Sequence, residues 1–386
     1  MTILRACNAQ VISMIFHCQK QIGAVSFFIL ALAAEVFAAQ LDWKTDWEQT
    51  VAAARKEGQV NVYIYRYEGL LQDFKREFPG INVVAVTGSG NQLTNRIMAE
   101  RRAGKFIADI YSSGPSGNVG VLYKGKALDP LKPLLSLPEV VDESKWYGKE
   151  HRYADPEGKY VFAYLAKASD TQLAYNSGLV NPKEINSYWD LTQPKWKGKI
   201  VSLDPRDNGL GGAMQFFYFS PELGAEFIKK FFATMDIQFA KNVRQITDWL
   251  GQGRYAICFG CKDSMKAKNQ GLPVADFETT KWKEGASFTA GGGSLSYLNQ
   301  APHPNAAKLF INWFLSRRGQ IALQMRGDVD EPPNSRRIDI PKDDVPVANR
   351  LSPDGKYFDV VKPEYADQKP INDLIKEIMT ANEAKK

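Results

Sequence analysis

The sequence predicts an α/β protein built from two lobes. Three observations support this fold class. The chain has 386 residues, more than one average domain contains. Residues 46–124 alternate helical and strand periodicity, an order that calls for right-handed crossovers and a parallel sheet. After a proline-rich stretch at 125–160, new strand patterns begin a second unit.

Composition narrows the class of protein. Hydrophobic residues make up 44% of the chain and charged residues 24%, which is typical of a globular protein and unlike disordered or coiled-coil chains. The formal net charge of +6 comes from 49 basic and 43 acidic residues that are interspersed along the sequence. Because this distribution forms no basic stripe, we expect no nucleic-acid partner.

The first 38 residues have the pattern of a secretory signal peptide. An apolar run at Ile22–Ala34 follows Lys20 and precedes Val36-Phe37-Ala38, a small-x-small cleavage pattern. The run is too short for a transmembrane helix, which needs about 18 residues or more. We therefore expect cleavage after Ala38 and export to the periplasm.

The elements of the first unit follow one another at short intervals. A helix at 46–58 is amphipathic, and Gly58 is placed to end it. The expected elements after it are a strand at 60–65, a helix at 69–78, a strand at 82–86, a helix at 91–103, a strand at 107–112 and a helix at 117–124.

Each of these strands runs into a polar or glycine-rich turn. The turns are Arg66–Glu68, Thr87–Gly90 and Ser112–Gly117. Ligands of open α/β sheets lie at the carboxyl ends of the strands, so the three turns are expected to share one rim.

The second unit begins where strands at 162–166 and 172–175 cross over. Further expected elements are strands at 199–203 and 255–259, helices at 221–235 and 244–252, a returning strand at 294–298, a helix at 305–317 and a last helix at 371–381. We assign residues 39–170 and 291–386, including the C-terminal helices, to lobe 1, and residues 171–290 to lobe 2.

Small and hydroxyl residues in the turns are candidates for binding an anion. Helix N-termini expose unpaired N–H groups and carry partial positive charge, and glycine allows close approach to the backbone. Simple helix capping is the alternative for any single turn. The candidates of this kind are Ser89, Gly90, Ser113 and Ser116 of lobe 1, and Gly209 and Gly211 of lobe 2.

Two arginines are placed to contact an anion from opposite lobes. Arg66 follows the first strand and Arg206 follows the strand at 199–203, and a guanidinium can bind a carboxylate or phosphonate through two hydrogen bonds. The alternatives are ion pairs with Glu68 for Arg66 and with Asp204 or Asp207 for Arg206. We also assign to the cleft Tyr67, Tyr175, Gly292 and Gly293.

The predicted mature chain has one pair of cysteines, Cys258 and Cys261. An even pair suits an oxidising compartment, and the spacing favours a local disulfide at the cleft edge. A reactive thiol pair and a metal site are the alternatives. With only His151 and His303 in the mature chain, we expect no metal site and no cofactor.

Several segments in order resemble a known family. They are Gly104–Asp109, Pro194–Val201 leading into Asp204-Pro205-Arg206, Ala301–Phe310, and Gln320. Together they resemble the periplasmic solute-binding proteins of ABC importers, in the group labelled ferric-iron type, over residues 45–340. The resemblance implies a type II periplasmic-binding-protein fold with two interleaved α/β lobes, a two-strand hinge, a ligand cleft between the lobes, and a membrane permease and ATPase as partners.

One departure from that family concerns the ligand. Ferric members place two adjacent tyrosines near the strand end that here reads Ala256–Cys261, and neither tyrosine is present in this segment. Iron(III) prefers oxygen ligands such as phenolates, so the absence of the pair argues against iron as the ligand. We therefore expect the protein to capture a small anionic solute, a carboxylate or phosphonate, by closure of the lobes, and we expect it to be a monomer. Capture of Fe(III) or a ferric complex is the first alternative.

The second alternative is an exported enzyme that uses the two cysteines. The sequence has no GxSxG or HExxH motif, so we expect no hydrolytic enzyme.

Overall fold

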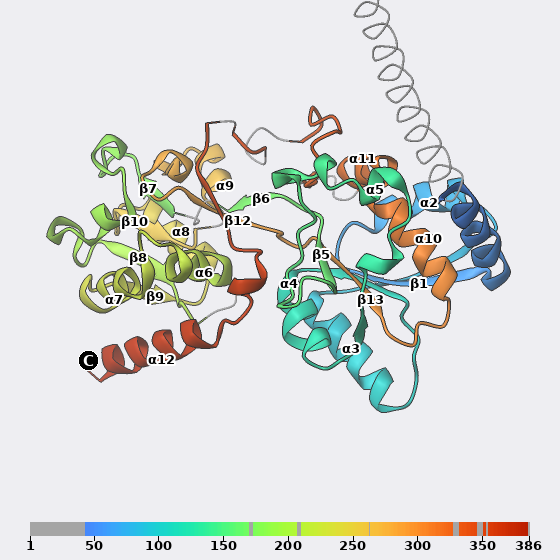
Figure 1. Ribbon diagram of the computed structural model, residues 1–386. Coiled ribbons are helices and arrows are strands. Elements are labelled where there is room, and N and C mark those ends of the chain that lie inside the picture. Colours follow the sequence, from blue (N-terminus) through green and yellow to red (C-terminus); the bar gives the residue numbers. More distant parts are fainter. Residues whose placement is uncertain are drawn as a thin grey trace, which may run out of the picture.

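A computed structural model describes residues 43–169, 173–206, 210–261, 263–326, 332–345, 350–352 and 354–384 (Figure 1). The predicted signal peptide, residues 1–38, lies outside the described residues. The described chain forms two lobes that are joined by a narrow connection. Each lobe has its own β-sheet with helices packed around it, as predicted for an α/β protein.

The sheet of lobe 1 has six strands in the order β2-β1-β3-β13-β4, with β5 also paired to β13. The strands are β1 (Gln59–Ile64), β2 (Asn82–Thr87), β3 (Ile110–Ser113), β4 (Leu128–Asp129), β5 (Val161–Ala163) and β13 (Ser294–Leu298). β1 is parallel to β2 and β3, and Ile64 pairs with Thr87 on one side and Ser112 on the other. β13 is antiparallel to its three partners. The carboxyl ends of β1, β2 and β3 therefore meet at one edge.

The third strand begins three residues later than its hydrophobic pattern predicts. Before Ile110, side-chain hydrogen bonds join this segment to β1: Asn61 N–H donates to Asp109 Oδ2 at 2.7 Å, and Asn61 Nδ2 donates to the Ile107 carbonyl at 2.8 Å. Asp109 also keeps backbone hydrogen bonds, because its N–H donates to the Asn61 carbonyl and its carbonyl accepts from Leu298 N–H, both at 3.0 Å.

The helices of lobe 1 cover its sheet. They are a helix over residues 43–57, α2 (Leu71–Glu77), α3 (Gly90–Arg102), α4 (Pro115–Gly117), α5 (Pro138–Val141), α10 (Pro304–Leu315) and α11 (Arg317–Arg326). The predicted helix at 117–124 is instead the short α4 followed by one wide turn at Asn118–Tyr123.

The sheet of lobe 2 has five strands in the order β11-β7-β10-β8-β9. The strands are β7 (Leu173–Asn176), β8 (Ile200–Leu203), β9 (Gln238–Ala240), β10 (Ile257–Phe259) and β11 (Val274–Asp276). The helices on this lobe are α6 (Gly211–Phe219), α7 (Gly224–Thr234), α8 (Val243–Gly251), α9 (Ser264–Asn269) and α12 (Lys369–Glu383). Aromatic residues of α6 and α7 form much of its core; Phe217 and Phe227, for example, pack edge to face with ring centroids 4.9 Å apart.

The connection between the lobes is a small sheet of three strands in the order β14-β12-β6. Its strands are β6 (Lys167–Ser169), β12 (Ala286–Thr289) and β14 (Tyr357–Asp359). β6 and β12 are antiparallel and correspond to the two-strand hinge expected from the resemblance. β14 is parallel to β12 and adds a third strand.

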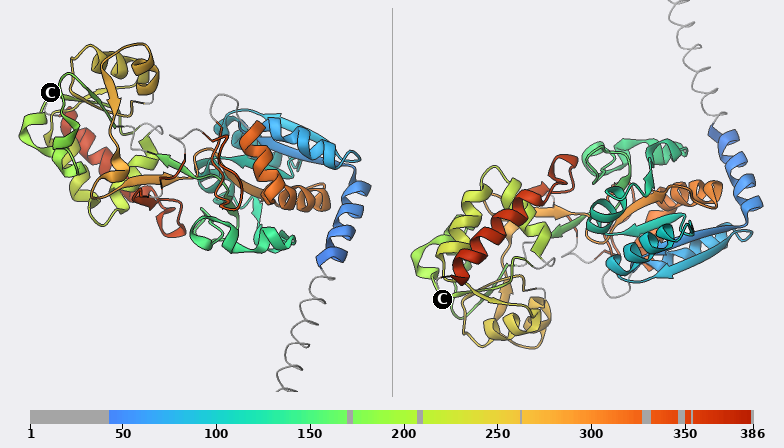
Figure 2. Two further views of the ribbon diagram at one scale, coloured as in Figure 1. Left: turned by 90° about the horizontal axis from the view of Figure 1, so that it is seen from above. Right: turned by 90° about the horizontal axis from the view of Figure 1, so that it is seen from below.

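The C-terminal helix α12 packs against α6 and α7 of lobe 2 (Figure 2). The sequence analysis assigned residues 291–386 to lobe 1, and for α12 the structure differs. The physical reason is its apolar face, on which Ile371, Ile375 and Ile378 are buried at the helix surface of lobe 2. The chain thus returns to lobe 2 after the third crossing.

Short 3₁₀ turns complete the described chain. They are Glu68–Leu70, Lys132–Leu134, Glu143–Lys145, Tyr147–Lys149, Pro182–Glu184, Tyr188–Thr192, Pro194–Trp196, Thr279–Lys281 and Pro363–Tyr365. Within the described residues, no helix has the length and apolar character needed to cross a membrane.

Candidate ligand-binding cleft

A cavity of about 970 Å³ lies between the two lobes. Its walls come from the strand-end turns of lobe 1, from the start of α6 in lobe 2, and from the connecting sheet and the segment that follows β14. Six of the predicted site residues line it: Ser89, Gly90, Ser113, Ser116, Gly211 and Gly292. The turns after β1, β2 and β3 all reach this cavity, through Tyr65, Ser89–Asn91 and Ser113–Gly117 respectively.

The N-terminus of α3 forms one part of the lobe 1 wall. Ser89 caps the helix: its Oγ accepts from Gln92 N–H at 3.4 Å, and its own N–H donates to Gln92 Oε1 at 2.9 Å. Gly90 follows, and a Cβ at this position would lie 2.9 Å from Ser113 Oγ. Glycine therefore lets the turns after β2 and β3 approach each other. The first turn of α3 contains no acidic residue, so its partial positive charge is not neutralised locally.

The turn after β3 is fixed from below by a buried polar network. Asn118 Nδ2 donates to Ser294 Oγ at 2.8 Å, and Ser296 Oγ donates to Asn118 Oδ1 at 2.5 Å. Ser294 Oγ in turn donates to the Ser113 carbonyl at 2.6 Å. All of these side chains are buried, so the network holds the turn at Ser113 against β13.

Tyr111 joins the two turns of lobe 1. Its hydroxyl donates to the Gly90 carbonyl at 3.1 Å. Burial raises the pKa of Tyr111, so the phenol keeps its proton and remains a hydrogen-bond donor at neutral pH.

The wall from lobe 2 is the first turn of α6. Gly211, Gly212 and Ala213 line the cavity, and this turn also lacks acidic residues. A Cβ on Gly212 would lie 3.2 Å from Thr289 Cγ2 of the connecting sheet, so α6 begins close to β12. Two helices of nine or more residues, α3 and α6, thus present their N-termini to one cavity from different lobes.

Positive charge dominates the ionisable groups of the cavity. Lys124, Lys167, Lys362 and Lys369 line it, against a single carboxylate, Asp373. Lys369 and Asp373 form an ion pair with each other, one turn apart on α12. Lysine is protonated at neutral pH, so the cavity carries a net positive charge.

Arg206 pairs with two acidic residues outside the lining of the cleft. Its guanidinium binds Asp204 through Nε and Nη2, with Nη2 2.6 Å from Oδ2, and Nη1 lies 2.9 Å from Glu383 Oε1 on α12. Arg206 is not among the residues that line the cavity. The pairing with Asp204, which the sequence analysis held as the alternative, is the one observed.

Arg66, Tyr67 and Gly293 also fall outside the lining of the cavity. Arg66 is exposed with a backbone φ of 59°, and the preceding residue, Tyr65, takes its place on the wall. Tyr67 is buried in the core of lobe 1. Gly293 lies beneath Leu165, whose Cγ would be 2.1 Å from a Cβ at that position.

Two further predicted residues do not line the cleft either. Tyr175 packs on Phe277 within lobe 2, with ring centroids 4.5 Å apart. Gly209 lies outside the described residues.

The two cysteines form a disulfide, Cys258–Cys261, at the end of β10. Both are buried in lobe 2, and neither lines the cavity. Gly260 between them has a φ of 89°, a backbone conformation that favours glycine in this tight turn.

The cleft offers few hard ligands for a metal ion. Its lining includes one phenol, Tyr65, and one carboxylate, Asp373. Over the described part of the chain, His, Cys, Asp and Glu side chains form no group of three or more that could hold a metal ion.

Sequence reasoning missed the lysines and the C-terminal part of the wall. Lys167 directly follows the strand pattern at 162–166, so its position where the chain crosses between the lobes was a usable signal. Lys362 and Lys369 lie in a proline- and charge-rich tail whose pattern gives no sign of where it packs.

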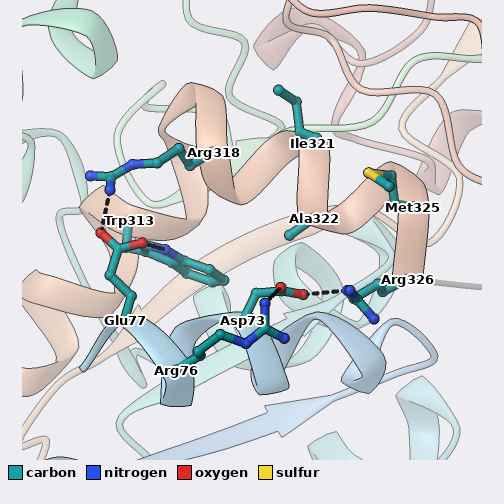
Figure 3. A pocket seen from close by; sticks show the side chains of 9 residues that line it. All are labelled: Asp73, Arg76, Glu77, Trp313, Arg318, Ile321, Ala322, Met325 and Arg326. Atoms are coloured by element: carbon teal, nitrogen blue, oxygen red, sulfur yellow. Dashed lines mark hydrogen bonds and ion pairs between the residues drawn. The ribbon is translucent and has the colours of Figure 1, made fainter. Parts of the chain in front are cut away.

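A second cavity, of about 450 Å³, lies on lobe 1 between α2 and α11 (Figure 3). Its charged residues are paired across it: Arg326 Nε lies 2.8 Å from Asp73 Oδ2, and Arg318 Nη1 lies 2.8 Å from Glu77 Oε1. Trp313 Nε1 donates to Glu77 Oε2 at 3.0 Å. These contacts tie α2 to α10 and α11, so we interpret this cavity as part of the packing of lobe 1.

Comparison with known proteins identifies relatives of the chain. A sequence profile described as bacterial extracellular solute-binding protein matches residues 69–339. Iron uptake protein A1 of Synechocystis is 24% identical over 149 residues, 38% of this chain and 38% of that protein. A protein of Haemophilus influenzae is 29% identical over 151 residues, 38% of this chain and 42% of that protein. The chain therefore aligns with less than half the length of these two relatives.

Solved structures share the fold over most of the chain. FutA of Trichodesmium in complex with iron and citrate has a TM-score of 0.60 at 20% identity, covering 84% of this chain and 99% of that chain. Apo FutA2 from Synechocystis has a TM-score of 0.61 at 15% identity, covering 83% and 98%. AfuA from Actinobacillus pleuropneumoniae, with fructose-6-phosphate bound, has a TM-score of 0.56 at 19% identity, covering 83% and 97%.

At these identities the likeness establishes the fold, which is that of the two-lobed periplasmic binding proteins, and it does not carry over a ligand. The family expected from the sequence is confirmed by the profile. Because the profile spans well over half of the chain, the protein belongs to the bacterial extracellular solute-binding protein family.

Proposed function

We propose that this protein is the periplasmic solute-binding component of an ABC importer and that it captures a small organic anion between its lobes. The observation that carries the proposal is the charge of the cleft. Four lysines and the N-termini of α3 and α6 face one cavity that contains a single carboxylate. Such a site favours a carboxylate or phosphonate over a cation or a neutral solute.

Binding and closure are coupled in this proposal. Lobe 1 contributes the N–H groups around Gly90, and lobe 2 contributes those of Gly211 and Gly212. An anion that accepts hydrogen bonds from both sets is bound more tightly when the lobes approach each other. Closure about β6 and β12 also removes water, which strengthens each electrostatic contact.

The remaining assignments follow from this role. The protein acts as a monomer exported by its N-terminal signal peptide, and the closed, loaded form delivers the solute to a membrane permease with its ATPase. Its work is binding rather than catalysis. The ligand contacts we propose are Ser89, Gly90, Ser113, Ser116, Gly211 and Gly292, joined by Tyr65 and Lys167.

Fe(III) alone is the less favoured cargo. Ferric ion prefers several anionic oxygen ligands, and the lining offers the Tyr65 phenol and the Asp373 carboxylate, the second of which is paired with Lys369. A ferric complex of an organic anion would present its anion to the lysines, and it therefore belongs in the test.

Titration calorimetry on the mature protein tests the proposal. The panel is citrate, methylphosphonate, methanesulfonate, ferric citrate, ferric ion and, as a neutral control, glucose. We expect saturable binding of at least one organic anion and none of glucose. Lys167→Gln is expected to weaken that binding tenfold or more, whereas Lys376→Gln, an exposed lysine on α12 outside the lining, leaves it within twofold.

If ferric ion saturates the protein and no organic anion gives measurable heat of binding, the anion proposal is overturned in favour of iron. Binding of glucose alone would overturn the role given to charge.

A further inference from the structure

Eight of the residues that line the cleft come from the segment after β14. They lie between Val360 and Asp373, and they include Lys362, Gln368, Lys369 and Asn372. The family profile ends at residue 339, so this part of the wall lies beyond the region by which the family is recognised. Lobe 1 and the start of α6 do not enclose the cavity completely, and this segment forms the remaining side.

The first half of the segment is attached to both the connecting sheet and α6. Val360 N–H donates to the Phe288 carbonyl at 3.0 Å, which extends the pairing of β14 with β12. Gln215 of α6 is almost completely buried, and its Nε2 donates to the Tyr365 carbonyl at 2.6 Å and to the Val360 carbonyl at 3.3 Å. The Tyr365 ring stacks on Phe219, with centroids 4.7 Å apart.

A buried ion pair holds the segment to lobe 1. The Arg336 side chain is 2% exposed, and its two Nη atoms donate to the carboxylate of Asp359 in β14 at 3.0 and 3.2 Å. Arg336 Nε donates to the Leu165 carbonyl at 2.9 Å, just before β6, and the guanidinium lies over the Phe288 ring of β12 at 4.4 Å. One arginine thus contacts all three chain crossings.

The second half of the segment is attached to lobe 2. α12 buries Ile371, Ile375 and Ile378 against that lobe, and Asn382 Nδ2 donates to the Phe232 carbonyl at 2.9 Å. Lys369 and Asn372 lie on the exposed side of the same helix and line the cavity. When lobe 2 moves, this side of the wall moves with it.

We propose that residues 360–373 form a third wall of the binding cleft, whose Lys362 and Lys369 select solutes that carry more than one negative charge. The inference rests on the proposed function. A single carboxylate is satisfied by the helix N-termini alone, whereas a second negative group that reaches across the cavity meets these two lysines. Each lysine has an exposed acidic neighbour on the same segment: Lys369 pairs with Asp373, and Lys362 Nζ lies 3.9 Å from Glu364 Oε1. Of these two carboxylates only Asp373 lines the cavity, so the segment still brings more positive than negative charge to it.

The test compares two double variants of the mature protein. One is Lys362→Gln with Lys369→Gln. The control is Lys230→Gln with Lys376→Gln, which removes the same charge from exposed positions of lobe 2 outside the lining. The side chains of Lys362 and Lys369 are 38% and 78% exposed, so we expect both double variants to fold and to unfold at similar temperatures.

The probes are citrate, inorganic phosphate and methylphosphonate, titrated by calorimetry at two salt concentrations. We expect the cleft variant to bind the preferred probe at least tenfold more weakly than the wild type and to lose part of the salt dependence of binding. The control variant is expected to keep both within twofold. The loss is expected to be largest for citrate, the probe with the most charges.

The possible failures are distinguishable. If the wild type binds a probe and the cleft variant binds it equally well, the third wall is overturned while the proposed function stands. An equal loss in both variants also overturns it, because the lysines then act only through the overall field. If the wild type binds none of the organic anions in either panel, the proposed function fails and this inference fails with it.

Discussion

The two sides of the cleft are built in different ways. The lobe 1 side consists of three turns, each joined directly to a strand of one parallel sheet, within residues 65–117. The opposite side combines the start of α6 with residues 360–373, which are separated by about 150 positions and meet through Gln215. The first side depends on local capping and glycine placement, and its third turn is also held by the buried hydrogen bonds that join Asn118 and Ser113 to β13. The second depends on long-range packing and on buried polar contacts.

This difference indicates where each side is vulnerable. A change in a turn of lobe 1 disturbs a short piece of backbone that rests on a sheet. A change in a long-range anchor releases a whole segment, because nothing local specifies its position.

The largest effect is expected from removing the anchor of the C-terminal side. Asp359→Ala leaves the buried Arg336 guanidinium without its carboxylate, and Arg152, whose Nε lies 3.2 Å from the same group, loses a partner as well. Breaking one side of a buried pair costs about 3 kcal/mol or more, so we expect a loss of this size in the free energy of unfolding.

Urea denaturation measures this loss, with Glu364→Ala, an exposed carboxylate of the same segment, as the control. A loss below about 1 kcal/mol, within the range of exposed ion pairs, would contradict the anchoring role.

An intermediate effect is expected on the lobe 1 side. Gly90→Ala brings a Cβ to 2.9 Å from Ser113 Oγ and 3.4 Å from the Tyr111 hydroxyl, so either the Ser113 hydroxyl must rotate or the two turns must separate slightly. Overpacking of this kind costs about 1 kcal/mol, and we expect weaker anion binding together with a small loss of stability. Gly80→Ala is the control, since Gly80 lies outside the lining and the nearest atom to a Cβ there, Arg55 Cγ, is 3.8 Å away. Comparable losses in both variants would show that the close approach at Gly90 is unimportant.

The smallest effect is expected from Arg206→Ala. This arginine is 45% exposed and binds Asp204 and Glu383, so its removal should cost about 1 kcal/mol or less and leave anion affinity unchanged. Its hydrogen bonds hold the pKa of Asp204 below the usual range. The stabilising pair is therefore complete above the ordinary carboxyl pKa near 3.9 and is lost as the pH falls through the lower folded value.

Unfolding of wild type and Arg206→Ala at pH 7 and at pH 3 measures this difference, which should shrink at the acidic pH. A marked loss of anion binding in the variant would return Arg206 to the site.

Part of the lobe 1 side was predictable from the sequence because its signals are local, although Arg66, Tyr67 and Gly293 do not line the cavity. Two strand-end turns are recognisable in the sequence: Ser89 and Gly90 directly before a helical pattern, and the small residues from Ser113 onward. The order of parallel strands places such turns at one edge of the sheet. Gly211 was also assigned to the cleft, and it lines the cavity, but the helix that it begins, α6, was not predicted from the sequence.

Other assignments required distances that a sequence does not contain. Arg206 has an acidic neighbour two positions away and another, Glu383, at the far end of the chain, and only the folded structure decides that both bind it. Lys362 and Lys369 reach the cleft because β14 pairs with β12. This pairing covers only three residues, and the sequence of β14 has no distinct strand pattern.

The third crossing through β14 also has a consequence for how the protein is made. Synthesis proceeds from the N-terminus, so every strand of both large sheets leaves the ribosome before residues 357–383 do. Until those last residues emerge, the helix face formed by α6 and α7 lacks its cover, and the pocket lacks a side. The strands of both large sheets are therefore synthesised before the segment that completes the wall of the cavity.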